Sequence, residues 1–286
     1  MRYGLALPNG GGPFGDARTL VELTQLAEAA GWDGVFLEDY IIHHSAPDAP
    51  TCDPWVALGA MALATQHIRL GIEVTPLSRR RPWKVAREAV TVDHLSSGRL
   101  ILGVGAGDVG DPGFGKVGEA TDLKTRAHML DEALAILAGL WSGQPFSFHG
   151  DHYHLDEMTF QPTPIQQPRI PIWIGGNWPH KGVLRRAATW DGFCGGKAHA
   201  EDEDWRLTPD ETRQLIADIQ RQRTSPTPCE IVLGGSERGP DPDADRALIA
   251  SLAEVGATWW IEYVHSGLGD LPTLRELVAR GPLRSA

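Results

Sequence analysis

Apolar runs and amphipathic segments alternate along the whole chain. Several runs, such as 68–76 (IRLGIEVTP) and 170–176 (IPIWIGG), are almost continuously apolar, which is typical of parallel strands that are covered by helices. The segments between the runs, such as 123–143, place apolar residues at helical spacing. The expected strands are residues 2–8, 33–39, 68–76, 99–105, 170–176, 191–196, 229–235 and 258–264. The expected helices are residues 17–31, 53–66, 82–96, 123–143, 183–190, 209–223, 243–256 and 273–280.

This alternation predicts an α/β fold, a single (β/α)8 TIM barrel that spans residues 1–286. The chain holds about eight strand–helix units of roughly 30 to 40 residues each, the number and size that such a barrel needs. A small hairpin insertion is expected near 146–168. A doubly wound sheet with a second domain is the alternative, but no linker or break in composition separates two halves. In barrels the chemistry lies at the carboxyl ends of the strands.

Composition and charge narrow the class of protein. The net charge of −11 argues against nucleic-acid binding, because phosphate contacts need clustered Lys and Arg. No apolar run approaches the length of a membrane span, and the N-terminus does not resemble a signal peptide. The three cysteines, an odd number far apart, disfavour a disulfide framework. We expect a cytoplasmic protein without nucleic-acid or membrane partners, and we expect the acidic run 201–204 to be a solvated loop.

Five segments together resemble one family, the bacterial luciferase-like flavin- and deazaflavin-dependent oxidoreductases. They occur in the order in which the family has them: DPWVALGAMALATQHIRLG (53–71), VTPLSRRRPWKVAREAVTVDHLSSGRLILGVGAGD (74–108), FHGDHYHL (148–155), IPIWIGGNWPHKGVLRRAATWDGF (170–193) and GATWWIE (256–262). The resemblance implies a barrel that binds FMN or the deazaflavin coenzyme F420. It also implies hydride transfer or oxygen activation at the flavin ring, acting on a small organic substrate. A homodimer is implied as well, and a flavin reductase partner if FMN is the cofactor.

The glycine-rich stretch ILGVGAGDVG (101–110) matches the G-x-G-x-x-G fingerprint of dinucleotide-binding proteins. In a Rossmann unit the glycine turn opens a helix directly. Here Pro112 and further glycines follow before any helical spacing begins, which disfavours that interpretation. The alternative is a strand end at which missing side chains let a flat ring lie against the backbone. That alternative assigns cofactor contacts to Gly105, Ala106 and Gly107.

The stretch IGGNWPHKG, after the expected strand 170–176, is a better candidate for phosphate binding. Two glycines at a strand end, before a helix N-terminus, present backbone N–H groups to an anion. The resemblance places the cofactor phosphate at this loop, and Lys181 would add charge. The alternative is an ordinary loop with a surface lysine. The residues concerned are Gly175, Gly176, Asn177, Trp178 and Lys181.

A second cofactor contact is predicted at the end of the third expected strand. The resemblance places the flavin ring on a bulge near Val74 and Thr75, often with a non-proline cis peptide. Three arginines follow in the sequence, Arg79, Arg80 and Arg81. They either meet the phosphate of the cofactor or an acidic substrate, or they form an exposed basic loop.

The catalytic candidates are Asp39, Tyr40 and Asp108. Relatives in the family carry an acidic residue followed by His after the second strand, whereas here Asp39 is followed by Tyr40. Tyrosine titrates near pH 10 rather than about 6.5, so it would shuttle protons poorly at neutral pH. His43 or His44 could take over that role, or could be ordinary loop residues. Asp108 is either an acid–base residue, as the resemblance implies, or the first polar residue of a loop.

Histidines 149, 152 and 154 raise the question of a metal site. Two histidines two positions apart on a strand share one face, yet the family has a similar hairpin without metal. No cysteine or glutamate-rich partner is apparent, and we predict no metal site. Two other functions stay open, a non-catalytic flavin-binding protein and a metal-assisted barrel hydrolase that uses these histidines.

Overall fold

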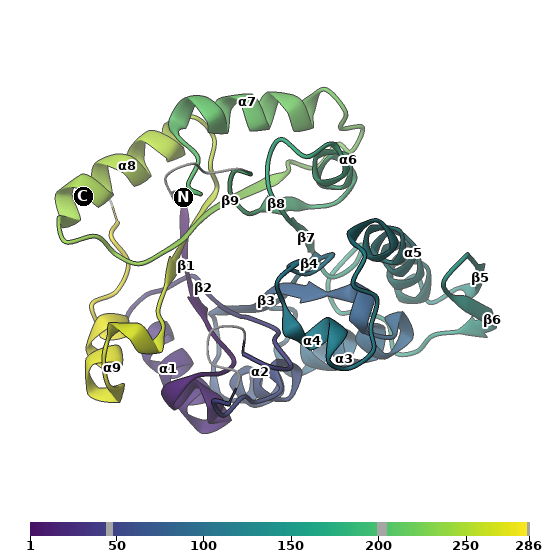
Figure 1. The fold of residues 1–286 in the computed structure, drawn as a ribbon, viewed down its shortest axis with the longest axis horizontal. Coiled ribbons are helices and arrows are strands. Elements are labelled where there is room, and N and C mark those ends of the chain that lie inside the picture. The colour runs from purple at the N-terminus through teal and green to yellow at the C-terminus, as the bar shows by residue number, and fades with distance from the viewer. Residues whose placement is uncertain (44–47, 199–204, 285–286) are drawn as a thin grey trace.

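A computed structural model describes residues 1–43, 48–198 and 205–284. Eight parallel strands close into a barrel in the order β1-β10-β9-β8-β7-β4-β3-β2, as predicted. Helices lie around the outside of this barrel (Figure 1). The strands are β1 (Arg2–Leu7), β2 (Gly34–Leu37), β3 (Arg69–Pro76), β4 (Leu100–Gly105), β7 (Ile172–Gly175), β8 (Gly192–Cys194), β9 (Glu230–Ser236) and β10 (Trp259–Tyr263). The long helices are α1 (Ala17–Ala29), α2 (Pro54–Ala64), α3 (Pro82–Leu95), α5 (Leu123–Trp141), α6 (Lys181–Thr189), α7 (Pro209–Gln220), α8 (Pro242–Glu254) and α9 (Leu271–Ala279).

The predicted elements begin and end within a few residues of the observed ones. Four short elements were not expected: the helix α4 (Pro112–Gly115) and the 3-10 turns η1 (Gly12–Gly15), η2 (Leu77–Arg79) and η3 (Ser266–Leu268). Each is too short for hydrophobic spacing to reveal it. The expectations for His44 and for the acidic run 201–204 concern residues outside the described part of the chain.

Most long helices begin with a side chain that accepts a hydrogen bond from the backbone of the first turn, which stabilises the helix end. Asp53 caps α2 in this way by accepting from the N–H of Val56 at 2.9 Å. Helices α3 and α6 have no such side-chain cap. Helix α3 begins at Pro82, whose missing N–H needs no cap. The uncapped start of α6 is therefore the exception.

Three aromatic rings fill the interior of the barrel. The Phe36 ring lies 5.1 Å from that of Trp173 and 5.7 Å from that of Trp259, measured between centroids. The three residues come from β2, β7 and β10, which are not neighbours in the barrel, so their rings meet across its interior. Gly71 leaves room for this cluster, because a Cβ atom there would lie 2.8 Å from Phe36 Cδ1. The rings close the barrel beneath the carboxyl ends of the strands.

A two-stranded antiparallel hairpin, β5 (Pro145–His149) and β6 (His154–Thr159), projects beyond α5 at the side of the barrel (Figure 1). The Glu132 carboxylate of α5 accepts hydrogen bonds from backbone N–H groups of its turn, such as that of Tyr153 at 2.9 Å. The rings of His149 and His154 are 5.7 Å apart. Across the described residues, no group of three or more His, Cys, Asp or Glu side chains could hold a metal ion. None of the described helices is both long and apolar enough to cross a membrane.

Candidate active site

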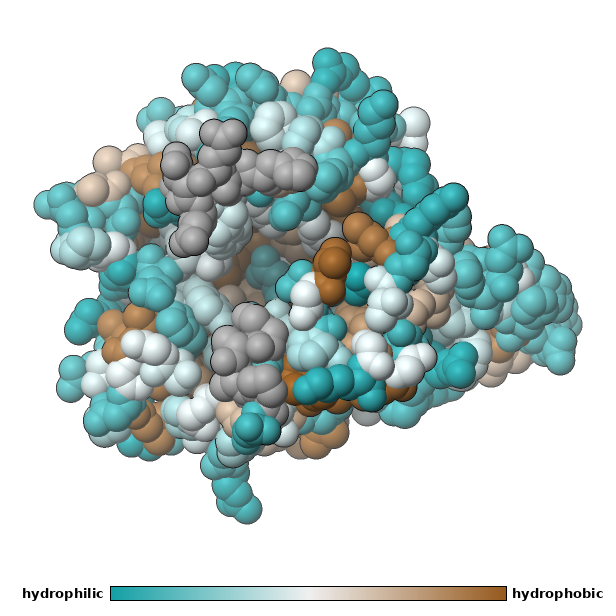
Figure 2. Space-filling view, viewed as in Figure 1, coloured by the Kyte–Doolittle hydropathy of each residue, from teal (hydrophilic) through white to brown (hydrophobic). Residues whose placement is uncertain are grey.

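The carboxyl ends of the strands surround a depression near the centre of one face of the molecule (Figure 2). Two cavities, of about 170 and 180 Å³, lie in this barrel mouth. Val74, Tyr40 and Asp108 line one of them, and Trp205 and Tyr263 line the other. Both cavities share two further wall residues, Glu38 and Glu73. These two glutamates therefore lie where the two cavities meet.

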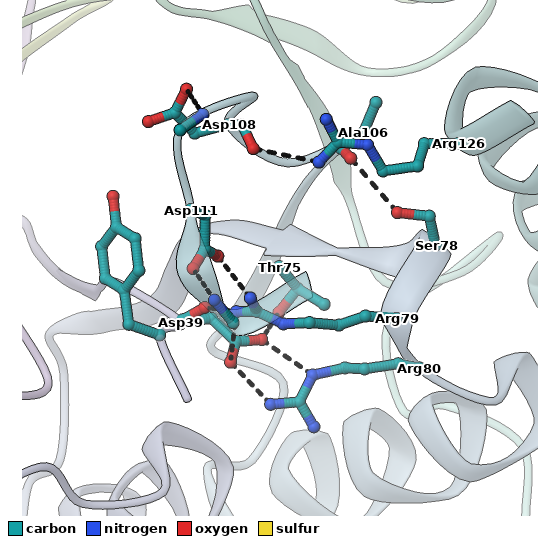
Figure 3. Close-up of polar contacts among 12 residues, drawn as sticks. Asp39, Thr75, Ser78, Arg79, Arg80, Ala106, Asp108, Asp111 and Arg126 are labelled. Atoms are coloured by element: carbon teal, nitrogen blue, oxygen red, sulfur yellow. Dashed lines mark hydrogen bonds and ion pairs between the residues drawn. The ribbon is translucent and has the colours of Figure 1, made fainter. Parts of the chain in front are cut away.

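Two side chains hold the buried carboxylate of Asp39, one from β3 and one from the segment after it (Figure 3). Arg80 donates to both of its oxygens, from Nη2 at 2.6 Å and from Nε at 2.8 Å. The Thr75 hydroxyl donates to Asp39 Oδ2 at 3.0 Å. This binding orients Asp39 within the protein and points Thr75 toward it, away from the mouth.

Arg79 joins the ends of β2 and β3 to the loop after β4 (Figure 3). Its buried guanidinium donates to the carboxylate of Asp111 and to the backbone carbonyl oxygen of Asp39. The Phe114 ring packs against the same guanidinium, 5.1 Å from its carbon. Neither expectation for the arginine run, anion binding or an exposed basic loop, describes Arg79 and Arg80. Nearby carboxylates bind these two arginines because burial makes an unpaired charge costly.

Asp108 and Tyr40 lie at the rim of the mouth. The exposed Asp108 carboxylate accepts from the N–H of Gly110 at 3.1 Å, a bond that shapes its own loop. Its carbonyl oxygen accepts from Arg126 at 3.0 Å (Figure 3). The Asn9 side chain holds the backbone of Tyr40 from both sides, at 2.8 and 3.1 Å. Burial, followed by the charges of nearby carboxylates, raises the pKa of the Tyr40 phenol, so its hydroxyl is a hydrogen-bond donor at neutral pH.

The glycines at the ends of β4 and β7 make room for a side chain of β3. A Cβ atom at Gly105 would lie 3.1 Å from Val74 Cγ2, and one at Gly175 would lie 2.5 Å from Val74 Cγ1. Gly107, with φ of +84°, leaves room for Phe114. No dinucleotide turn is formed, since β4 is a barrel strand and the long helix after it begins only at Leu123.

A bulge lies at the third strand, close to the predicted position. The peptide bond between Glu73 and Val74 is cis, one bond before the expected one. The register between β3 and β4 shifts between Ile72 and Thr75. Val74 thus faces the mouth, between the ends of β4 and β7.

The loop before α6 offers fewer donors to an anion than the sequence suggests. The N–H groups of Gly176 and Trp178 already donate, to the carbonyl oxygens of Cys194 at 3.2 Å and of Gly196 at 2.9 Å. Among described residues, the N–H groups of Asn177, Lys181 and Gly182 have no hydrogen-bond partner. Lys181 is exposed and forms no ion pair with a described residue. An uncapped helix start beside a free lysine fits the phosphate group that FMN and F420 share.

Neither Glu38 nor Glu73 is among the residues predicted from the sequence. Together with Tyr263 they lie two positions beyond barrel-facing residues of β2, β3 and β10. Because side chains alternate along a strand, all three point into the barrel, one layer above the aromatic rings. A signal was available: Glu73 is the single acidic residue in the apolar run 68–76.

The side-chain pKa values of both glutamates are raised well above the usual value for glutamate. Burial raises the pKa of Glu38 to about 7, although Tyr263 donates a hydrogen bond to it. Burial, and next the charge of Glu38, raises the pKa of Glu73 to about 7. One oxygen of each carboxyl group, Oε2, is buried without a hydrogen-bond partner among the described residues. The pair can therefore hold or release a proton near neutral pH.

Comparison with known proteins relates most of the chain to one family. The sequence profile of luciferase-like monooxygenases matches residues 1–233. F420-dependent glucose-6-phosphate dehydrogenases from Nakamurella multipartita and Beutenbergia cavernae are 33% and 34% identical over 164 and 171 residues. These matches cover 56% and 57% of this chain, and 47% and 48% of those proteins. The chain thus spans about half the length of these curated relatives.

Solved structures share the fold. An F420-dependent tetrahydromethanopterin reductase from Methanopyrus kandleri has a TM-score of 0.73 at 18% identity, over 98% of this chain and 97% of that one. A monooxygenase from Streptomyces bottropensis has a TM-score of 0.76 at 17% identity, over 97% of this chain and 96% of that one. At such low identity the likeness extends to the barrel fold and no further.

Proposed function

Because this chain belongs to the luciferase-like monooxygenase family, we propose that it is an oxidoreductase that binds F420 and acts on a small organic substrate in the barrel mouth. FMN is the second candidate cofactor, and it would require a flavin reductase as partner. The observation that carries the proposal is the barrel mouth itself, in which a cavity lies over Val74 and the uncapped start of α6 follows β7. Relatives named as F420-dependent dehydrogenases favour F420 over FMN.

Each part of the mouth has a place in this proposal. Lys181 and the free N–H groups at the start of α6 would hold the phosphate, and Val74 would support the ring. The bound cofactor would supply the redox chemistry, hydride transfer with F420 or oxygen activation with reduced FMN. Tyr40 and Asp108 would contact the substrate from the rim. We assign Asp39 a positioning role, since Arg80 and Thr75 occupy its carboxylate.

Titrating the purified protein with F420 and with FMN, and following the quenching of cofactor fluorescence, tests the cofactor proposal. We expect F420 to bind in the micromolar range or tighter, and FMN at least tenfold more weakly. Tighter binding of FMN would reassign the protein to the monooxygenase branch. Binding of neither cofactor would overturn the oxidoreductase proposal, and binding without turnover on any acceptor would favour a flavin-binding protein.

Replacing Lys181 with alanine is expected to weaken F420 binding about tenfold, because a charge-assisted contact to phosphate contributes roughly 1.5 kcal/mol or more. Fluorescence titration of both proteins measures the change. The control is Lys84→Ala, which removes a lysine paired with Glu88 on α3. An unchanged affinity in the Lys181 variant would exclude the start of α6 as the phosphate site.

We further propose a homodimer that buries the outer faces of α2 and α3. Val56 and Leu63, one above the other on α2, are 74% and 67% exposed, and Leu95 of α3 is 39% exposed. Water-exposed apolar side chains that share a face favour association. The cytoplasmic location stays a prediction, which cell fractionation would test.

The double replacement Val56→Lys and Leu63→Lys is expected to convert the dimer to a monomer, because lysines cannot be buried without a partner. Light scattering after size exclusion would report a mass near 31.1 kDa instead of twice that value. The control is Val117→Lys, which changes a 48%-exposed valine before α5. A wild-type protein that is already monomeric would contradict the proposal.

A further inference from the structure

We propose that the substrate carries a protonated amine or a similar organic cation, and that the carboxyl groups of Glu38 and Glu73 receive it. This inference rests on the proposed function only in taking the barrel mouth as the substrate site. It names a class of substrate that neither the family nor the relatives specify. Four features of the mouth support it: the two carboxyl groups are adjacent, no cation pairs with them among the described residues, aromatic residues line the adjoining wall, and an anion fits poorly there.

The strand register brings the two glutamates together. In the pairing of β2 with β3, Leu37 lies opposite Ile72. The next residues along the two parallel strands are Glu38 and Glu73, whose side chains both point into the barrel. Neighbouring strands are about 4.8 Å apart, so the two carboxyl groups share one small volume at the junction of the two cavities.

Neighbouring buried carboxylates each have an arginine, but these two have none. Asp39 binds Arg80, Asp111 binds Arg79, and Glu262 binds Arg238 at 2.9 and 3.1 Å. By contrast, no ion pair joins Glu38 or Glu73 to any Lys, Arg or His of the described residues. Their buried Oε2 atoms also lack hydrogen-bond donors. An ammonium group would supply both the positive charge that this pair lacks and donors for its two Oε2 atoms.

Aromatic residues form the adjoining wall of the mouth. Trp205 and Tyr263 line the cavity of about 180 Å³ together with the two glutamates. Gly235 makes room for the indole, since a Cβ atom there would lie 2.6 Å from Trp205 Cη2. Aromatic faces attract organic cations through their electron-rich centres. Carboxylates beside aromatic rings therefore form a receptor for an ammonium group that carries an apolar portion.

An anionic substrate would fit this position poorly. Arg79, Arg80 and Arg238 are already bound to carboxylates, and the two acids that line both cavities have no ion-pair partner among the described residues. A phosphorylated sugar, which the names of the F420-dependent relatives mention, would meet like charge at Glu38 and Glu73. Like charges in contact without a counter-ion are destabilising. We therefore expect discrimination against phosphate esters and carboxylates at this place.

Binding of three probes of similar shape, benzylamine, benzyl alcohol and benzoate, tests the proposal in the absence of cofactor. Calorimetry near pH 8 should give an affinity for benzylamine at least tenfold higher than for benzyl alcohol, and no binding of benzoate. Glu73→Gln and, separately, Glu38→Gln should each weaken benzylamine binding tenfold or more while leaving benzyl alcohol unchanged. Glu157→Gln, at an exposed position of β6, is the matched control and should change nothing.

Equal affinities for the amine and the alcohol would overturn the proposal, and would identify the pair as a site for a proton alone. Unchanged benzylamine binding in both glutamine variants, or no binding of any probe, would overturn it too. Circular dichroism checks that each variant is folded, and the second variant serves if one is not. Because no cofactor is present, failure here is separate from failure of F420 to bind, which would instead contradict the proposed function.

Discussion

Replacing Arg79 with methionine is expected to lower the free energy of unfolding by about 3–5 kcal/mol, as breaking a buried ion pair does elsewhere. The substitution keeps an apolar chain of similar length but removes the guanidinium that binds Asp111 and the backbone of Asp39. Asp111 is 5% exposed, so its charge would be left without compensation. The loop that carries Asp108 should loosen at the same time, since Phe114 loses one of the two guanidinium groups against which it packs.

Urea unfolding monitored by circular dichroism measures this loss. The matched control is Arg246→Met, which removes an exposed pair with Asp243 on α8 and should change stability by at most about 1 kcal/mol. A double variant that adds Asp111→Asn should recover part of the loss, because the unpaired charge is then gone. A loss below about 1 kcal/mol in the single variant would show that water reaches this pair and that the ends of β2 and β3 are held by other contacts.

The second large effect concerns pH. Glu73→Gln is expected to stabilise the protein at about pH 8 by roughly 3 kcal/mol, the equivalent of a pKa raised from 4.5 to about 7. A carboxyl group with a raised pKa in the folded state lowers stability as it ionises. In the wild type the free energy of unfolding should therefore fall as the pH rises from about 4.5 through 7, and stay low above that.

Glu38, Tyr263 and Cys194 lie beside Glu73, and of these three only Glu38 titrates in the same pH range. The charge of Glu38 repels that of Glu73, so removing the charge at Glu73 also removes an unfavourable interaction for the Glu38 carboxylate. Tyr263 hydrogen-bonds Glu38 and has a raised pKa, as has the nearby Cys194 thiol, so both stay neutral over the range. Thermal melts of the cofactor-free protein at pH 5 and pH 8 test it, with Glu157→Gln as control. A gain of equal size at both pH values would show that packing rather than ionisation is responsible.

With the two glutamates in view, we propose a different division of roles among the acids of the mouth. Asp39 follows β2 and looked from the sequence like an acid at the reacting centre. In the fold its carboxylate is bound by Arg80 and Thr75, whereas the residue before it points into the barrel. Alternation along one strand thus places an acid that Arg80 and Thr75 bind next to one without an ion-pair partner among the described residues, although both border the same cavity. Which of the two side chains points into the barrel depends on the phase of the strand.

The glycine stretch at the end of β4 is a second case in which contacts between distant segments could not be predicted from the sequence. Its spacing matched a nucleotide fingerprint, and the absence of a following helix argued correctly against one. The room that glycine leaves for a flat ring stays a prediction, and the structure adds a second reason for glycine. Val74 and Phe114 occupy the space at Gly105 and Gly107, and both come from other segments of the chain. A single sequence cannot show which distant side chain will fill a gap.

The sequence by itself determined the strands, the long helices and their closure into a barrel. Those features follow from the local spacing of apolar residues and from the repetition of one strand–helix unit. Both can be recognised from residues that are close together in the sequence. Only the tertiary structure decided that Glu38 and Glu73 share a volume, that Arg79 and Arg80 are neutralised, and that Gly176 and Trp178 use their N–H groups internally. These depend on strand register and on contacts between distant segments. Burial then sets the charge of each group, and burial is a property of the folded chain.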